Sequence, residues 1–180
     1  MKLRDSRGFS LIELAIYIAL LGMIAALLTP LIISMFNGQK TVSTLTTAAS
    51  ESQNATTVLH ADIRNARELR VGGTNGSWLS ASIAQGTNGW QCVRWRFDAA
   101  GHTLSRTTWP EGTAFPAGAR GVIANNVTTQ GSTNPFSLAA GTGTATATGT
   151  VTYSLRVGGI DMSGKASNRA AAAGSATCFA

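Results

Sequence analysis

A single carboxylate lies inside the most apolar part of this sequence. From Phe9 to Phe36 the chain reads FSLIELAIYIALLGMIAALLTPLIISMF, a run of 28 residues in which Glu13 is the one charged side chain. By insertion scales a carboxylate at the centre of a membrane helix costs about 2.5 to 3.5 kcal/mol, and less near the end of the helix. A simple anchor gains nothing from that cost. The acid therefore predicts a cationic partner from outside the block, such as one on a second copy of the chain.

The two cysteines, Cys92 and Cys178, lie 86 positions apart. Two are too few for a structural zinc site, which usually takes four Cys or His ligands, and no pairing with His60 or His102 has ligand spacing. If this part of the chain lies outside the cytoplasm, a disulfide is the natural reading, and two free thiols are the alternative. The sequence predicts no metal site.

No nucleophile, zinc-protease, phosphate-loop or dinucleotide motif occurs in the chain, so no catalytic residue, enzyme activity or cofactor is predicted. Asp98 and His102 are close in sequence, and turn chemistry explains them better than a catalytic dyad. Aromatic and cationic residues could form a stacking surface for single-stranded nucleic acid, although a half-buried strand with a solvated face is the preferred reading. These residues are Trp78, Trp90, Trp95, Trp109, Arg94, Arg96 and Arg106.

The length of the apolar block defines the element that positions the buried acid. At 1.5 Å per residue its 28 residues make a helix of roughly 42 Å, longer than a hydrocarbon core of about 30 Å. Residues 9–36 are therefore expected to span a membrane. Lys2, Arg4 and Arg7 precede the block, and Lys40 is the one basic residue soon after it. The positive-inside rule then places the N-terminus in the cytoplasm and the chain from about residue 37 outside.

Two residues weaken the expected membrane helix. Pro30 has no N–H, so the hydrogen bond to the carbonyl of Ala26 is lost, and Gly22 costs about 1 kcal/mol relative to alanine. Together they enclose a stretch that can unwind or bend. The alternative is that both residue types are simply common in membrane helices.

After the apolar block, an amphipathic helix is predicted over residues 37–70. Its stripe of small and apolar positions recurs at three- and four-residue steps. The stripe comprises Val42, Leu45, Ala49, Ser52, Thr56, Leu59, Ile63, Ala66 and Arg70. Basic residues near the end and the pair Gly72-Gly73 indicate the helix terminus. One nearly continuous helix from about Phe9 to Arg70 is expected, and Gly38 is a third place where it can bend.

Residues 71–180 are predicted to form a β-rich domain. Val93, Trp95 and Phe97 alternate with polar residues, and residues 104–109 would return antiparallel. Residues 151–157 alternate in the same way. Weaker candidates are residues 121–127 and the low-complexity stretch 141–150, GTGTATATGT, which is either strand or loop. The expected fold class is α+β, with a long N-terminal helix packed on a C-terminal antiparallel sheet.

The composition limits the function classes further. Charged residues make up 12% of the chain and hydrophobic residues 44%, with 20 glycines in 180 residues. These values exclude a coiled coil, a collagen, a highly charged disordered tail and a disulfide-dense mini-protein. The formal net charge of +6 falls to +4 (11 basic minus 7 acidic residues) without the first eight residues, a mild surplus that is compatible with anionic partners but does not require them.

The N-terminal residues carry a family resemblance. The run Arg7-Gly8-Phe9-Ser10-Leu11-Ile12-Glu13-Leu14 resembles the processing motif of type IV prepilins and type II secretion pseudopilins. The resemblance implies that a membrane peptidase cuts between Gly8 and Phe9, that Phe9 is then N-methylated, and that Glu13 is the family's acid at the fifth mature position. Gly22 and Pro30 occupy places where the family commonly has helix-weakening residues.

The resemblance also implies a function and partners. The acid of an incoming subunit would pair with the terminal amine of a neighbour in a filament, after the chain has left the lipid bilayer. The partners would be other pilin subunits, the prepilin peptidase and methyltransferase, and an inner-membrane assembly platform. The cytoplasmic membrane and then a surface or periplasmic filament would be the location. The alternatives are a monomeric membrane-anchored receptor and a DNA-uptake pilus component, for which DNA binding has weak support.

A second resemblance concerns the β-rich domain. Residues 93–107, VRWRFDAAGHTLSRT, resemble a strand–turn–strand of the larger minor pilins and J-type pseudopilins, whose helices often end in a sequence like ADIRNA at residues 61–66. This resemblance favours a minor, tip-associated subunit over the abundant shaft subunit.

Overall fold

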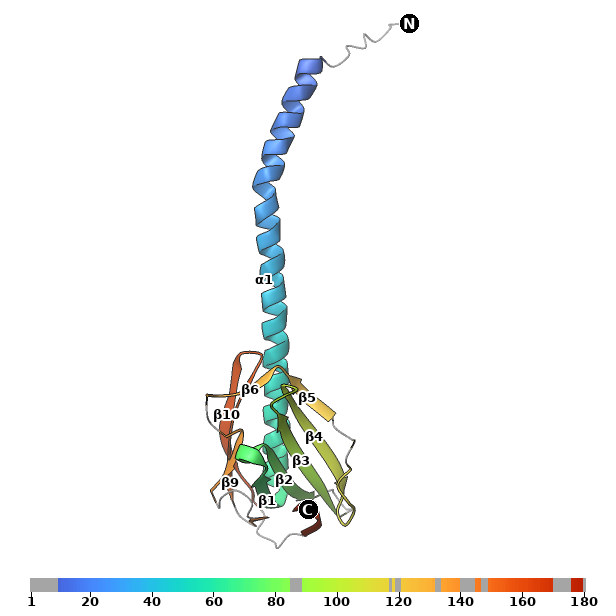
Figure 1. Cartoon of the computed structure of the whole chain (residues 1–180), viewed down its shortest axis with the longest axis vertical. Helices are drawn as coiled ribbons and strands as arrows, with labels where there is room; N and C mark the ends of the chain where they lie inside the picture. The colour runs from blue at the N-terminus through green and yellow to red at the C-terminus, as the bar shows by residue number, and fades with distance from the viewer. Residues whose placement is uncertain are drawn as a thin grey trace. The chain divides into compact units, whose positions relative to one another are not determined.

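The computed structural model describes residues 10–84, 89–116, 118, 121–131, 134–139, 145–146, 149–169 and 176–179. The chain divides into two compact units, residues 1–43 and residues 44–180. The first unit is helical, and the second contains the strands together with the last turns of the same helix, α1 (Figure 1). The architecture is α+β and pilin-like, as the sequence predicted.

Helix α1, Leu11–Asn65, is one continuous element of 55 residues. The helix continues through Gly22, Pro30 and Gly38 without a break. Next to the proline, the hydroxyl of Thr29 donates a hydrogen bond of 2.7 Å to the carbonyl oxygen of Ala25. This bond goes to the preceding turn and does not replace the one that Pro30 cannot donate to the carbonyl oxygen of Ala26.

The predicted end of the helix at Arg70 is wrong by five residues. The helix ends at Asn65, and Ala66–Gly72 is strand β1, paired antiparallel with β2 over its length. Leu69 and Val71 are fully buried and two positions apart, which is the period of a strand. Pairing with β2 therefore overrides the helical preference of this segment.

The larger sheet has six strands in the order β5-β4-β3-β2-β1-β8, and every pairing in it is antiparallel. Its remaining strands are β2 (Trp78–Ala84), β3 (Trp90–Asp98), β4 (Thr103–Pro110), β5 (Gly121–Asn125) and β8 (Ala145–Thr146). A short 3-10 turn, η1 (Thr74–Gly76), joins β1 to β2.

The smaller sheet is built on β9, Thr150–Val157. Its order is β10-β9-β6, and β7 also pairs with β9. The other strands are β6 (Val127–Thr129), β7 (Phe136–Leu138) and β10 (Ile160–Ser167), and a second 3-10 turn, η2, covers Ala176–Phe179.

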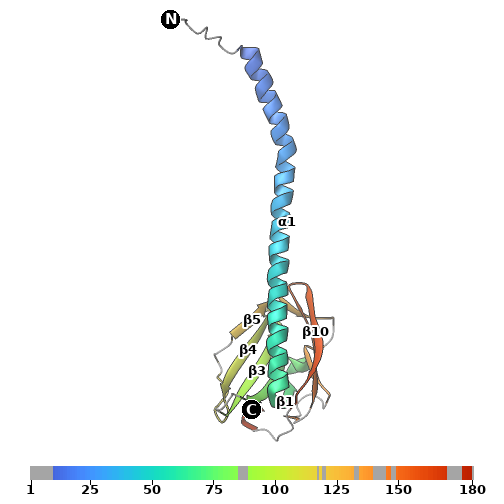
Figure 2. The same ribbon diagram turned by 180° about the vertical axis from the view of Figure 1, so that it is seen from behind.

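The core of the second unit lies between the end of α1 and the two sheets (Figures 1 and 2). Leu59 and Ile63 of the helix are fully buried together with Trp95 of β3, Phe136 of β7 and Leu155 of β9. The predicted helical stripe holds at Leu59 and Ile63 but not at its start, because Val42 is 65% exposed and Leu45 is 48% exposed. Among the described residues of α1, Ala48 is the first that is buried.

The clearest strand predictions are confirmed. Val93, Trp95 and Phe97 point into the core from β3, residues 104–109 return as β4, and residues 151–157 lie in β9. The weaker candidate at residues 121–127 is divided between β5 and β6, which belong to different sheets. Of the low-complexity stretch 141–150, residues 145–146 form β8 and Thr150 begins β9, while residues 141–144 and 147–148 lie outside the described part.

Candidate functional site

The described chain begins at Ser10, directly before α1. The carbonyl oxygen of Ser10 accepts hydrogen bonds from the amides of Glu13 (3.0 Å) and Leu14 (3.1 Å), which closes the first turn. The carboxylate of Glu13 thus lies in the first turn of the helix, where the helix dipole favours a negative charge. Gly8 and Phe9, the predicted cleavage and methylation positions, lie outside the described residues.

Around this acid the helix presents an unbroken apolar surface. Leu11 is 86% exposed, Ile12 70% and Leu14 54%, and the most apolar 18-residue window of α1 has no buried residue. By length and composition α1 is a helix that could cross a membrane. A continuous exposed apolar surface of this kind is typical of a segment that contacts lipid or another protein.

The two helix-weakening residues have no packing role in the described structure. A methyl group added to Gly22 would have no atom within 4 Å, and Pro30 is likewise in an exposed stretch. Neither residue is needed to fit a neighbour within the chain. In general, a glycine or a proline weakens the helical turn that contains it.

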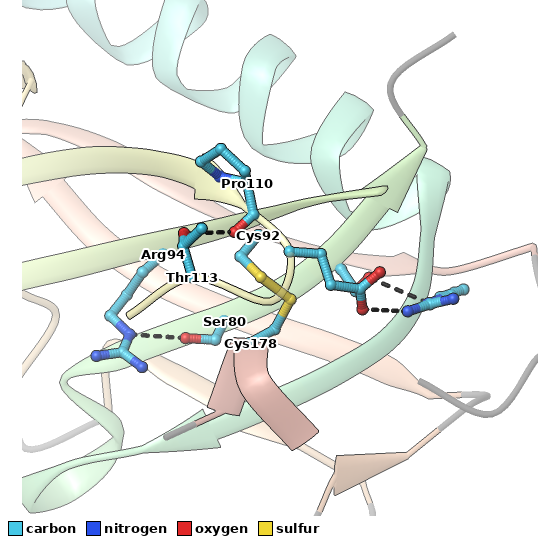
Figure 3. Close-up of a disulfide and its surroundings, with 9 residues drawn as sticks. Ser80, Cys92, Arg94, Pro110, Thr113 and Cys178 are labelled. Atoms are coloured by element: carbon cyan, nitrogen blue, oxygen red, sulfur yellow. Dashed lines mark hydrogen bonds and ion pairs between the residues drawn. A yellow bond between two sulfur atoms is a disulfide. The ribbon is translucent and has the colours of Figure 1, made fainter. Parts of the chain in front are cut away.

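The two cysteines meet on the face of the larger sheet that points away from α1. Cys92 of β3 and Cys178 of η2 form a disulfide with a Cα–Cα distance of 5.2 Å (Figure 3). Both are fully buried, and they share a small apolar cluster with Trp109, Phe115 and Phe179. The disulfide therefore attaches the segment around η2 to the outer face of the sheet.

Arg94 lies among aromatic rings on the same face. Its guanidinium carbon is 4.4 Å from the ring centre of Phe115, 4.8 Å from that of Trp78 and 5.6 Å from that of Trp109. Its Nε donates a 2.8 Å hydrogen bond to the hydroxyl of Ser80 (Figure 3). Burial lowers the pKa of Arg94, and the nearby charges of Arg70 and Arg96 lower it further.

The tryptophans and arginines that were considered as a surface for single-stranded nucleic acid are divided between two faces of the larger sheet. Trp95 and Arg106 point toward α1, where both donate hydrogen bonds to the carboxylate of Asp62. Trp78 and Arg94 lie on the opposite face. The set therefore does not form one stacking surface, which weakens the case for single-stranded nucleic acid.

The Asp98–His102 pair is explained by the β3–β4 turn. The Oδ1 atom of Asp98 accepts a 3.1 Å hydrogen bond from the amide of Ala100. Among the described residues, no group of three His, Cys, Asp or Glu side chains could hold a metal ion.

Sequence reasoning missed the central role of Asp62. This residue is 5% exposed and lies one position before Ile63 on the buried face of α1. An acid on the buried face of a helix requires a partner, and that signal was present in the sequence. The partners themselves were not visible, because Trp95 and Arg106 are 33 and 44 positions away.

The comparison with protein families gives one match. A model described as the prokaryotic N-terminal methylation motif matches residues 3–29. The matched span contains the Gly8-Phe9 junction, Glu13 and the first part of the apolar helix. No curated protein and no solved structure matches the chain. The motif and the pilin-like architecture support the type IV pilin and pseudopilin family.

Proposed function

We propose that this protein is a structural subunit of a type IV pilus or type II secretion-like filament, cleaved between Gly8 and Phe9 and assembled through α1. One observation carries the proposal: a methylation motif at residues 3–29 leads into a helix whose apolar side chains are exposed and whose first turn holds an acid. A filament of such helices would bury this apolar surface after it leaves the bilayer.

Glu13 has the chemistry to select the correct register between subunits. Cleavage would create an α-amine at Phe9, four residues before the acid along the chain. In a medium of low dielectric constant an unpaired charge is costly, so the carboxylate of one subunit would favour the position in which it meets the amine of a neighbour. The pair would thereby fix the axial position of one apolar helix against its neighbour.

The proposed organisation follows the chain. Residues 1–8 are the leader, residues 9–36 the membrane and assembly helix, and the remainder is the extracytoplasmic part. Before assembly, the N-terminus lies in the cytoplasm, and the head, which is the β-rich domain of residues 71–180, lies outside the cytoplasmic membrane. The partners are other pilin-like subunits, the prepilin peptidase and methyltransferase, and the assembly platform of the inner membrane.

A minor, tip-associated place in the filament is the finer form of the proposal. It is supported by the β3–β4 hairpin, whose residues 93–107 resemble the corresponding hairpin of larger minor pilins and J-type pseudopilins. A DNA-uptake role has less support, since the tryptophans and arginines face both sides of the sheet.

Mass spectrometry of the protein from its own cells tests the proposal. We expect a mature chain that begins at N-methylated Phe9. A Gly8→Leu variant should keep residues 1–8, while Ser6→Ala, a matched leader control, should be processed normally. A chain that retains Met1 to Gly8 in cells would contradict the proposal and favour the monomeric membrane-anchored receptor.

A further inference from the structure

A pocket lies in the second unit where β3 turns into β4. Its volume is about 690 Å³, and it is open to solvent. Four segments form its walls: η1, the β3–β4 turn, β6 and residues 134–135 before β7. The pocket therefore lies where the end of the larger sheet meets the smaller sheet.

Polar residues make up much of the lining of this pocket. Its lining includes Asn75, Arg96, Asp98, His102 and Asn134. Within the described part of the chain, the side chains of Asn75, Arg96 and Asn134 make no hydrogen bond or ion pair. Asp98 uses Oδ1 for the amide of Ala100, at 3.1 Å, so its other oxygen remains available for a ligand.

The walls are held in place by the backbone. The amide of Phe97 donates to the carbonyl oxygen of Ser77 (2.8 Å), and the amide of Val127 donates to that of His102 (2.9 Å). A third bond of 3.0 Å runs from the amide of Ser154 to the carbonyl oxygen of Pro135. These bonds tie each wall to a strand of one of the sheets, so the pocket is formed before any ligand arrives.

Two residues of the lining adopt a backbone conformation that L-amino acids rarely take. Asn75 has φ of 53° and His102 has φ of 50°. In the β3–β4 turn the left-handed position falls on His102 although Gly101, which would take it more easily, is adjacent. Asparagine and histidine are among the non-glycine residues that adopt this conformation most often, and both positions lie in turns that line the pocket.

The lining selects for a particular ligand chemistry. The positive charge of Arg96 is balanced by the negative charge of Asp98, so the pair gives no net attraction for an ion. Arg96 can only donate hydrogen bonds, Asp98 can only accept them, and the amides of Asn75 and Asn134 do both. Neighbouring hydroxyl groups, which donate and accept at once, match this mixture. Phe97, whose side chain belongs to the core, also borders the pocket.

We infer that this pocket is a binding site for a neutral saccharide presented outside the cell. The inference does not depend on filament assembly, because all lining residues belong to the second unit, but the location of the ligand outside the cell rests on the proposed topology. The class of ligand is inferred from the pocket alone, since the motif in the N-terminal helix does not indicate it.

A glycan array tests the inference. The full-length chain, in micelles of a detergent without a sugar headgroup, is applied to immobilised neutral, sialylated and sulfated oligosaccharides and to acidic peptides. We expect retention on at least one neutral oligosaccharide and a loss of affinity of tenfold or more in Arg96→Ala and in Asn134→Ala. Asn54→Ala, an exposed change on α1 outside the pocket, should bind like the unchanged protein.

Three results would overturn the inference. The first is that no neutral oligosaccharide is retained. The second is that the pocket variants and Asn54→Ala bind equally well while circular dichroism shows that all are folded. The third is retention on sialylated or sulfated oligosaccharides or acidic peptides alone, which would indicate recognition by charge and a different class of ligand.

Discussion

The carboxylate of Asp62 on α1 accepts two parallel hydrogen bonds from the guanidinium of Arg106 on β4. Nε lies 2.8 Å from Oδ2, and the terminal nitrogen Nη2 lies 2.9 Å from Oδ1. Trp95 donates a third bond of 2.7 Å to Oδ2. The carboxylate is only 7% exposed, so its charge is balanced almost entirely by these partners. The contact fixes the last turns of the helix against the larger sheet.

Asp62→Ala should therefore destabilise the second unit. The change leaves the guanidinium of Arg106 and the indole N–H of Trp95 without their acceptor, at a cost of about 2 to 3 kcal/mol. The unfolding temperature of the full chain, followed by circular dichroism in micelles, measures this effect. Asp161→Ala is the control: it breaks an ion pair with Arg156 whose partners are 57% and 50% exposed, so no comparable loss is expected. Equal losses in both variants would contradict the assigned role of Asp62.

The disulfide should contribute to stability by restricting the unfolded chain. It joins residues 86 positions apart, and closing a loop of this size stabilises a protein by about 2 to 5 kcal/mol. A reducing agent should lower the unfolding temperature of the natural chain and shift its tryptophan emission to longer wavelength, because Trp109 becomes hydrated. The Cys92→Ser/Cys178→Ser double variant should start lower and show no response to the reductant. A response in that variant would point to another effect of the reagent.

Replacing Glu13 by glutamine should separate membrane insertion from assembly. The amide keeps the shape of the side chain but removes the charge that an incoming subunit would present to a neighbour's amine. Fractionation should find Glu13→Gln in the membrane at the natural level and depleted at least tenfold from purified filaments. Glu51→Gln, which changes an acid that binds the amide of Asn125 in the head, is the matched control. Filaments that contain both variants equally would contradict the role proposed for Glu13.

Alkaline pH should weaken the head through Tyr153. Burial raises the pKa of this phenol, whose oxygen lies 2.7 Å from Nε2 of His60. The folded state then holds the proton more tightly than the unfolded state, which loses it near pH 10. Stability from this group is complete below pH 10 and falls as the pH rises toward the folded pKa. Unfolding temperatures between pH 8 and about 11 should show a steeper decline than those of Tyr153→Phe. Parallel declines would contradict the assignment.

Much of the fold was predictable because its strongest patterns are local. The apolar run defines α1, and strict alternation identifies β3 and β9 without any knowledge of their partners. β1 was missed since its sequence, ARELRVG, contains helix formers and charges, and its state depends on pairing with β2. β10 was missed for a related reason. Its Gly164 weakens the alternation but is required there, because an added methyl group would lie 2.5 Å from the oxygen of Tyr153.

The candidate sites also differ in how far they could be predicted from the sequence. Glu13 and the motif around it are contiguous in the sequence, so a resemblance to a known motif was enough to predict a role for them. The partners of Asp62 and the walls of the pocket come from strands that are distant in sequence. Ser80 and Ser82 of β2 illustrate the limit, because both are polar and yet fully buried. They are covered from above by residues of other segments, among them Arg94 and Arg67, which bind their hydroxyls.

The exposed apolar surface of α1 has a thermodynamic consequence for the proposed filament. The free energy of leucine and isoleucine side chains changes little when they move from lipid tails into a bundle of similar helices, because both surroundings are equally apolar. Transfer between the two would then be nearly balanced, and small forces from the envelope machinery could drive it in either direction. A polymer on this principle can be dismantled subunit by subunit and its parts stored in the bilayer for reuse.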